Sequence, residues 1–165
     1  MYKHLYFVCP SDNLEALIEK KFPHENYFMS SLGNSISFSK DIIEEVNALI
    51  ESKGIEKISF ILSEDNKLVL DGMRNQNFDN IKDLRKLFKN ISEIKTETSK
   101  VYKDGNIQKM ITSKLLKQKI KEMNVNLYDW LSSKVSIDAK VYCRNSDEFK
   151  HVPNHLTEPH SLHMN

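Results

Sequence analysis

The chain has 165 residues, a net charge of +1 and 28% charged side chains, values typical of a single soluble globular domain. No apolar run approaches the roughly 20 residues that a transmembrane helix needs, so we expect no membrane association. Two cysteines, Cys9 and Cys143, are too few for a disulfide framework and indicate a reducing, cytoplasmic environment. We predict one domain over residues 1–152, followed by a histidine-containing tail over residues 153–165.

The first predicted strand covers residues 5–9. It ends at Pro10, because a proline has no N–H to donate to a sheet. A short helix is predicted next, ending before Pro23. Three polar residues precede this helix and are candidates for its N-terminal cap: Ser11, Asp12 and Asn13.

The same alternation continues through two further strands. Residues 27–29 predict a second strand, and apolar residues at helical spacing predict a helix between Ser39 and Gly54, with Gly54 at its C-terminal end. The apolar run of residues 57–62 then predicts a buried third strand. This order predicts a parallel sheet with helices on both faces.

The second half of the chain is less regular. We predict a helix over residues 79–91, a polar loop over residues 92–106 and a long amphipathic helix over residues 107–123. Alternating residues 135–142 predict a half-exposed strand, which pairs with a short strand near residues 149–152. The expected fold is therefore three-layered α/β, with a mostly parallel sheet of about four strands and a C-terminal antiparallel edge hairpin.

Polar turns follow the three parallel strands. They are Cys9-Pro10-Ser11-Asp12, Ser31-Leu32-Gly33-Asn34 and Ser63-Glu64-Asp65-Asn66. Together with the closing hairpin they resemble the β-class carbonic anhydrases, whose three strands end in Cys-x-Asp-x-Arg, an Ala-Gly-Asn-like turn and His-x-x-Cys-Gly. The resemblance covers mainly residues 2–66 and 115–152, and it implies the fold of that family.

The zinc ligands implied by this resemblance are mostly replaced. The family binds zinc through two cysteines and one histidine, and only Cys9 remains here. Ser63 occupies the place of the histidine, Asn66 that of the second cysteine and Asn13 that of the arginine. A neutral hydroxyl and a neutral amide cannot substitute for imidazole and thiolate around zinc. We therefore expect no zinc, no other cofactor and no carbonic anhydrase activity.

Our leading hypothesis is a non-catalytic, carbonic-anhydrase-like protein that binds a small ligand or a protein partner, as a homodimer. Parallel α/β sheets bind ligands beyond the carboxyl ends of their strands, so we expect a pocket there. Its candidate residues are Cys9, Ser11, Asp12, Gly33, Asn34, Ser63, Glu64, Asp65 and Asn66.

The alternative is an enzyme with a rebuilt site at the same edge, with or without a metal. Glu64 and Asp65 would then act as an acid/base pair, although a solvated turn fits the pattern better because no basic or metal partner is visible in the sequence. Cys9 would be the nucleophile, although a cysteine at the end of a buried strand more often packs as a small apolar side chain.

Two further features suggest other partners. Four of the six histidines lie near the C-terminus, at His151, His155, His160 and His163, and are weak candidates for metal ligands in a solvated tail. Residues 82–121 carry 12 basic and 4 acidic side chains. This segment could contact phosphates, but it has no nucleic-acid motif, so we expect a solvated helix face rather than a nucleic-acid interface.

Overall fold

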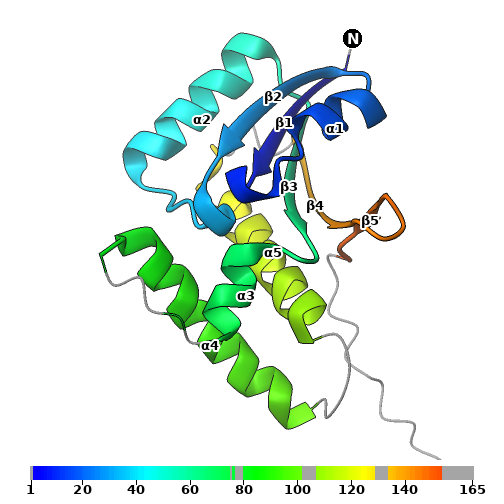
Figure 1. Ribbon diagram of the computed structural model, residues 1–165. Coiled ribbons are helices and arrows are strands. Elements are labelled where there is room, and N and C mark those ends of the chain that lie inside the picture. Colours follow the sequence, from blue (N-terminus) through cyan, green and yellow to red (C-terminus); the bar gives the residue numbers. More distant parts are fainter. Residues whose placement is uncertain (1, 75, 77–79, 102–106, 129–133, 154–165) are drawn as a thin grey trace, which may run out of the picture.

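A five-stranded sheet with the order β2-β1-β3-β4-β5 forms the centre of the molecule (Figure 1). The computed structural model describes residues 2–74, 76, 80–101, 107–128 and 134–153. The neighbouring pairs among β1 to β4 are parallel, and β5 runs antiparallel to β4. The predicted α/β fold with a closing hairpin is confirmed. The strands are β1 (Lys3–Val8), β2 (Glu25–Ser30), β3 (Lys57–Ser63), β4 (Ser136–Cys143) and β5 (Glu148–His151).

The helices cover the two faces unequally. α1 (Glu15–Lys21) lies on one face, whereas α2 (Lys40–Lys53) and α5 (Ile107–Asn126) pack on the other. α3 (Lys67–Met73) and α4 (Lys82–Val101) lie beyond the carboxyl ends of the strands (Figure 1). Two 3-10 turns, η1 (Pro10–Asp12) and η2 (Leu32–Asn34), follow β1 and β2 at that same end.

The core is divided by the sheet. The larger part lies between the sheet and helices α2, α4 and α5 and includes the stacked rings of Phe7 and Phe60. The smaller part lies under α1 and includes Tyr6, Ile18 and Ile61. Because β1 and β3 are covered on both faces, their apolar residues form continuous runs rather than an alternating pattern.

The predicted cap of the first helix is wrong. α1 has Leu14 at its N-cap and no side-chain cap, and Asp12 instead lies buried in η1. The two predicted helix ends are confirmed. α1 stops at Lys21, before Pro23, and α2 stops before Gly54, whose φ of 67° only glycine adopts without strain.

The predicted loop over residues 92–106 is also wrong in its first part, since α4 continues to Val101. The buried side chains of α4 are spaced three and four residues apart, so one stripe of the helix faces the interior. This stripe ends in a threonine rather than an aliphatic residue: Leu84, Leu87, Ile91, Ile94 and Thr98. The short helix α3, which the sequence pattern did not predict, packs on it. Gly72 permits that approach, because a Cβ there would lie 2.6 Å from Ile91.

Within the described ranges, no helix combines the length and apolar character needed to cross a membrane. Of the predicted tail, only residue 153 is described, so His155, His160 and His163 lie outside the described residues. His151 belongs to β5, where it is exposed.

Candidate functional site

The carboxylate of Asp12 links the ends of β1 and β3. Its Oδ2 accepts a hydrogen bond from the backbone N–H of Ser63 at 2.8 Å. Its Oδ1 accepts from the Ser63 hydroxyl at 2.7 Å and from the Asn66 amide at 2.9 Å. All three residues are at least 97% buried. Three hydrogen bonds therefore offset the free-energy cost of burying the Asp12 carboxylate.

Asn66 uses both ends of its amide. The Nδ2 group donates to Asp12, and Oδ1 accepts from the backbone N–H of Val69 at 3.0 Å. The second bond is the N-terminal cap of α3. Asn66, which the resemblance places where a metal ligand would be, therefore caps α3 and connects this helix to η1.

Cys9 is fully buried beside this network. Its Sγ accepts a hydrogen bond from the N–H of Gly33 at 3.1 Å and lies 3.1 Å from the hydroxyl of Ser11. The hydrogen-bond partners of the thiol among the described residues are a hydroxyl and a backbone N–H, and neither is a base that would activate it as a nucleophile. Gly33 has a φ of 60°, and a Cβ there would lie 2.5 Å from a terminal methyl of Leu87, so a larger residue would strain the backbone and displace that side chain.

Asn34 joins the two central strands. Its Nδ2 donates to the carbonyl of Phe7 on β1 at 3.2 Å and to that of Ile61 on β3 at 2.8 Å. Two acceptors on one side fix the amide orientation, since a flipped amide would put an oxygen against two carbonyls. The Oδ1 atom then faces away from both carbonyls. It is buried and has no hydrogen-bond partner among the described residues.

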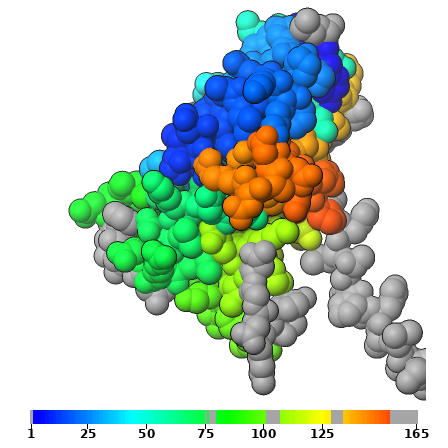
Figure 2. All heavy atoms as spheres, turned by 45° about the vertical axis from the view of Figure 1, so that its right-hand side comes forward, coloured from blue at the N-terminus to red at the C-terminus, as the bar shows by residue number. Residues whose placement is uncertain are grey.

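Arg144 is a site residue that the sequence pattern did not reveal. It follows β4, and its Nη2 donates to the backbone carbonyl of Asp12 at 3.0 Å. Its Nε lies 3.0 and 3.1 Å from the two carboxylate oxygens of Asp65. Figure 2 shows this hairpin region, in orange, between the blue N-terminal segment and the green helices. A guanidinium thus reaches η1 from residue 144, although Asn13 stands where the resemblance implies an arginine.

The predicted site residues divide into two groups. The structure brings together Cys9, Ser11, Asp12, Gly33, Asn34, Ser63 and Asn66 at the carboxyl ends of β1 and β3. Glu64 and Asp65 bond to residues outside this group. Asp65 is exposed and pairs with Arg144. Glu64 contacts the Cys143 thiol instead. Burial, and after it the hydrogen bond with Glu64, raises the pKa of that thiol. Glu64 and Asp65 therefore have separate partners and do not form a pair.

A second buried polar chain crosses the α1 face, and the sequence pattern did not predict it either. The Nε2 of His4 on β1 lies 2.8 Å from the hydroxyl of Ser59 on β3, and this hydroxyl donates to Asp138 on β4. His4 must then be the donor to Ser59. Because the serine proton is directed at the carboxylate and not at the imidazole, this order does not activate the serine as a nucleophile.

The charges around this chain determine its protonation. Burial, followed by the charges of Lys140 and Lys57, lowers the pKa of His4 to about 3. Burial raises the pKa of Asp138, but hydrogen bonds from Lys57 and Ser59 outweigh it and the pKa is lowered. His4 is therefore neutral and Asp138 ionised near neutral pH. The Nζ of Lys57 lies 2.7 Å from Asp138 and compensates its charge.

Among the described residues, no three His, Cys, Asp or Glu side chains converge in a way that could hold a metal ion. His151 lies 3.8 Å from Asp138. The predicted basic segment is partly neutralised by nearby acidic side chains, since Lys119 pairs with Glu122 and Lys114 with Glu97.

The solved structures most like this chain include several β-carbonic anhydrases. The β-carbonic anhydrase CafA of Aspergillus fumigatus has a TM-score of 0.74 at 10% identity, over 94% of this chain and 77% of its own. The Coccomyxa β-carbonic anhydrase in complex with acetazolamide has a TM-score of 0.71 at 12% identity, over 92% and 72%. A tetrameric β-carbonic anhydrase of Sordaria macrospora has a TM-score of 0.70 at 8% identity, over 92% and 80%.

No protein-family model and no curated protein matches the sequence. At identities of 8 to 12% the structural likeness concerns the fold alone. The predicted resemblance to the β-carbonic anhydrase fold is confirmed at this level.

Proposed function

We propose that this protein uses the β-carbonic anhydrase fold without its zinc chemistry and binds a small ligand at the carboxyl ends of its parallel strands. The observation that carries the proposal is the network of Asp12, Ser63 and Asn66, in which the carboxylate accepts three hydrogen bonds. Two of the donors, Ser63 and Asn66, stand where the resemblance requires zinc ligands.

The side chains present do not fit zinc. A tetrahedral site takes thiolate, imidazole or carboxylate ligands and keeps one position open for water. Cys9 is the only thiol in the network, and its Sγ accepts a hydrogen bond from Gly33. The Ser63 hydroxyl and the Asn66 amide both donate to Asp12, so their hydrogens occupy the space where a metal would bind that carboxylate.

Ligand binding at this edge is supported by Asn34. Its Oδ1 is a buried acceptor with no partner among the described residues, and a buried polar atom in that state is costly. Because this oxygen is closed to solvent, a ligand N–H or O–H reaches it only when the neighbouring side chains move aside. The carboxyl edge of a parallel sheet is also where α/β proteins generally bind ligands.

The proposal is tested by metal analysis and by a CO2 hydration assay on protein purified without a tag. We expect much less than one zinc per chain and no hydration above the uncatalysed rate, even after incubation with excess zinc. Stoichiometric zinc together with hydration activity would overturn the proposal.

A homodimer is part of this proposal. Support for self-association comes from the tetrameric state named for the Sordaria macrospora neighbour, which shares the fold. Light scattering over a range of protein concentrations tests it. We expect twice the chain mass of 19.3 kDa, and a monomer at every concentration would contradict it.

A further inference from the structure

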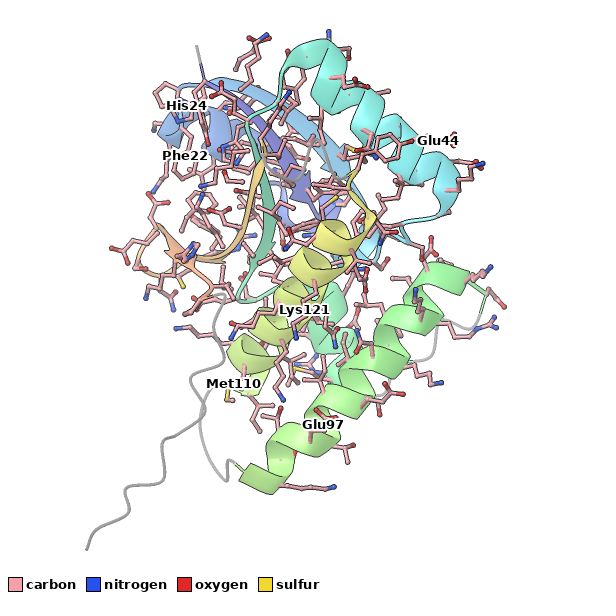
Figure 3. The ribbon with its side chains drawn as sticks, turned by 180° about the vertical axis from the view of Figure 1, so that it is seen from behind. Phe22, His24, Glu44, Glu97, Met110 and Lys121 are labelled. Atoms are coloured by element: carbon pink, nitrogen blue, oxygen red, sulfur yellow. The ribbon has the colours of Figure 1, made fainter. Side chains whose placement is uncertain are left out.

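An open groove lies between the neighbouring helices α4 and α5. Figure 3 shows α4, which carries Glu97, beside α5, which carries Lys121. Side chains of both helices line the groove, and its volume is about 340 Å³. One ordered water needs only about 10–15 Å³ on this measure, so the groove has room for a small organic molecule.

Three lysines of α5 line this groove: Lys114, Lys117 and Lys121. Their spacing of three and four residues puts them on one face of the helix, and the outer two lie about 10 Å apart along its axis. Lys121 is exposed and Lys117 is half-buried. Neither has an acidic partner in the described part of the chain. The ammonium groups of both residues are therefore free to bind an anion.

The third lysine has only a weak partner. The Nζ of Lys114 lies 3.7 Å from a carboxylate oxygen of Glu97, whose side chain is 71% exposed. Such an ion pair contributes little, because water screens both charges, and a bound anion can replace Glu97. The groove thus carries three positive charges and one negative charge, within a segment of 12 basic and 4 acidic side chains over residues 82–121. A surface of this kind attracts anions.

Hydrogen bonds between the two helices hold the walls of the groove in place. Asn90 of α4 donates to Gln118 of α5 at 2.6 Å, and Gln118 donates back to Asn90 at 3.3 Å. Gln118 itself lines the groove among the lysines. Because the walls are fixed before a ligand arrives, binding costs less ordering of the protein.

The other lining residues restrict the class of ligand. Ile94 and Ile120 are almost fully buried, so the groove offers a partner little apolar contact. Neither an aromatic side chain nor an arginine lines it among the described residues, so a nucleobase has no flat group on which to stack. Recognition then depends on charge, and a lysine ammonium binds phosphate as a point charge.

From these features we infer that the groove binds small molecules that carry two phosphate groups, with the phosphates at Lys117 and Lys121 and with Lys114 as a third contact. Each phosphate carries a charge of about −1.5 to −2 at neutral pH, so two of them match a row of three lysines better than one does. The inference goes beyond the proposed function, because none of the lining residues belongs to the network of Asp12.

A ligand series tests how many phosphates the groove recognises. Fructose 1,6-bisphosphate, fructose 6-phosphate and fructose are titrated separately into the full-length 15N-labelled protein at low ionic strength and followed by amide chemical shifts. Since one exposed ion contact contributes up to about a factor of five, we expect the bisphosphate to bind about fivefold more tightly than the monophosphate, and fructose not to bind. Equal affinities of the two phosphates, or no binding of the bisphosphate, would overturn the inference.

Two double variants that remove equal charge test the location. The groove variant, Lys117→Gln with Lys121→Gln, removes the two free lysines. The control, Lys82→Gln with Lys89→Gln, removes two exposed lysines of α4 that do not line the groove. Circular dichroism confirms that both fold. We expect the groove variant to weaken bisphosphate binding roughly tenfold or more, and the control to change it by less than about twofold. Equal losses would show that net charge alone attracts the ligand and would contradict the inference.

RNA is the competing occupant, and the trinucleotide UpUpU is the matched probe because it joins two phosphates to bases. We expect it to bind the unsubstituted protein more weakly than the bisphosphate does. Each of its phosphodiesters carries a single charge, and the groove offers its bases no stacking surface. Tighter binding of the trinucleotide, lost in the groove variant, would assign the groove to nucleic acid and overturn the inference.

Discussion

Both carboxylate oxygens of Asp12 accept hydrogen bonds from Ser63. One accepts from the backbone N–H at 2.8 Å and the other from the hydroxyl at 2.7 Å. The two residues are 51 positions apart. This contact places η1 against the end of β3, next to the start of α3. The same carboxylate accepts from Asn66, so its removal affects three segments together.

Asp12→Asn should lower the free energy of unfolding by about 2–4 kcal/mol, because an amide nitrogen then faces buried donors. Urea denaturation followed by circular dichroism measures this change. Asp65→Asn is the matched control. Asp65 is exposed, and its ion pair with Arg144 should contribute about 0.5 kcal/mol or less. Similar effects of the two variants would show that the buried network contributes little.

Ser63→His combined with Asn66→Cys should create a zinc site with Cys9 if the strand ends keep the geometry of the related fold. We expect about one zinc per chain in the double variant, and a rise of several degrees in its melting temperature when zinc is added. Each single variant supplies one ligand fewer and should bind zinc much more weakly. A double variant that folds but retains no zinc after dialysis would show that these positions do not converge on a metal.

Stability should fall as the pH is lowered below 6.5, because of His4. Its pKa is lowered from 6.5 to about 3 in the folded protein, mainly by burial. The unfolded chain therefore takes up a proton in this interval that the folded chain does not. The free energy of unfolding decreases by up to about 1.4 kcal/mol per pH unit for this one group.

His4→Gln should flatten this dependence between pH 6.5 and 4.5, since glutamine can still donate to Ser59 and does not titrate. His24→Gln, at an exposed histidine, is the control and should keep the slope of the unsubstituted protein. Denaturation curves at several pH values measure both. An unchanged slope in His4→Gln would contradict the role of His4.

Gly33→Ala should be more destabilising than Gly54→Ala. Both glycines have positive φ, 60° and 67°, so each alanine carries the backbone strain of about 1–2 kcal/mol. Only the Cβ at residue 33 meets another atom, since that at residue 54 has open space around it. The clash with Leu87 should add about 1–3 kcal/mol. Equal losses in the two variants, measured by urea denaturation, would show that α4 moves aside freely.

Local patterns were sufficient for most of the fold. The apolar run of β3, the helical spacing ahead of Gly54 and the alternation in β4 each depend on neighbours within one element, and all three elements were predicted. The predicted half-exposure of β4 is wrong, because most of its side chains are buried. The end of α4 was not predicted. The buried stripe of this helix continues to Thr98, a polar residue, and is recognisable as buried only when α3 and α5 cover it. α3 likewise depends on its packing through Gly72 and on its cap at Asn66.

The sequence by itself determined which chemical groups follow the parallel strands: one thiol, carboxylates, hydroxyls and amides. Only the tertiary structure decided how these groups pair. Asp12 bonds to Ser63, and Arg144 reaches η1 from 132 residues away. The side-chain oxygen of Asn34 is buried without a hydrogen-bond partner in the described part of the chain. Such pairings depend on strand order and on the orientation of each polar group. Both are set by the simultaneous packing of distant segments, which no local pattern records.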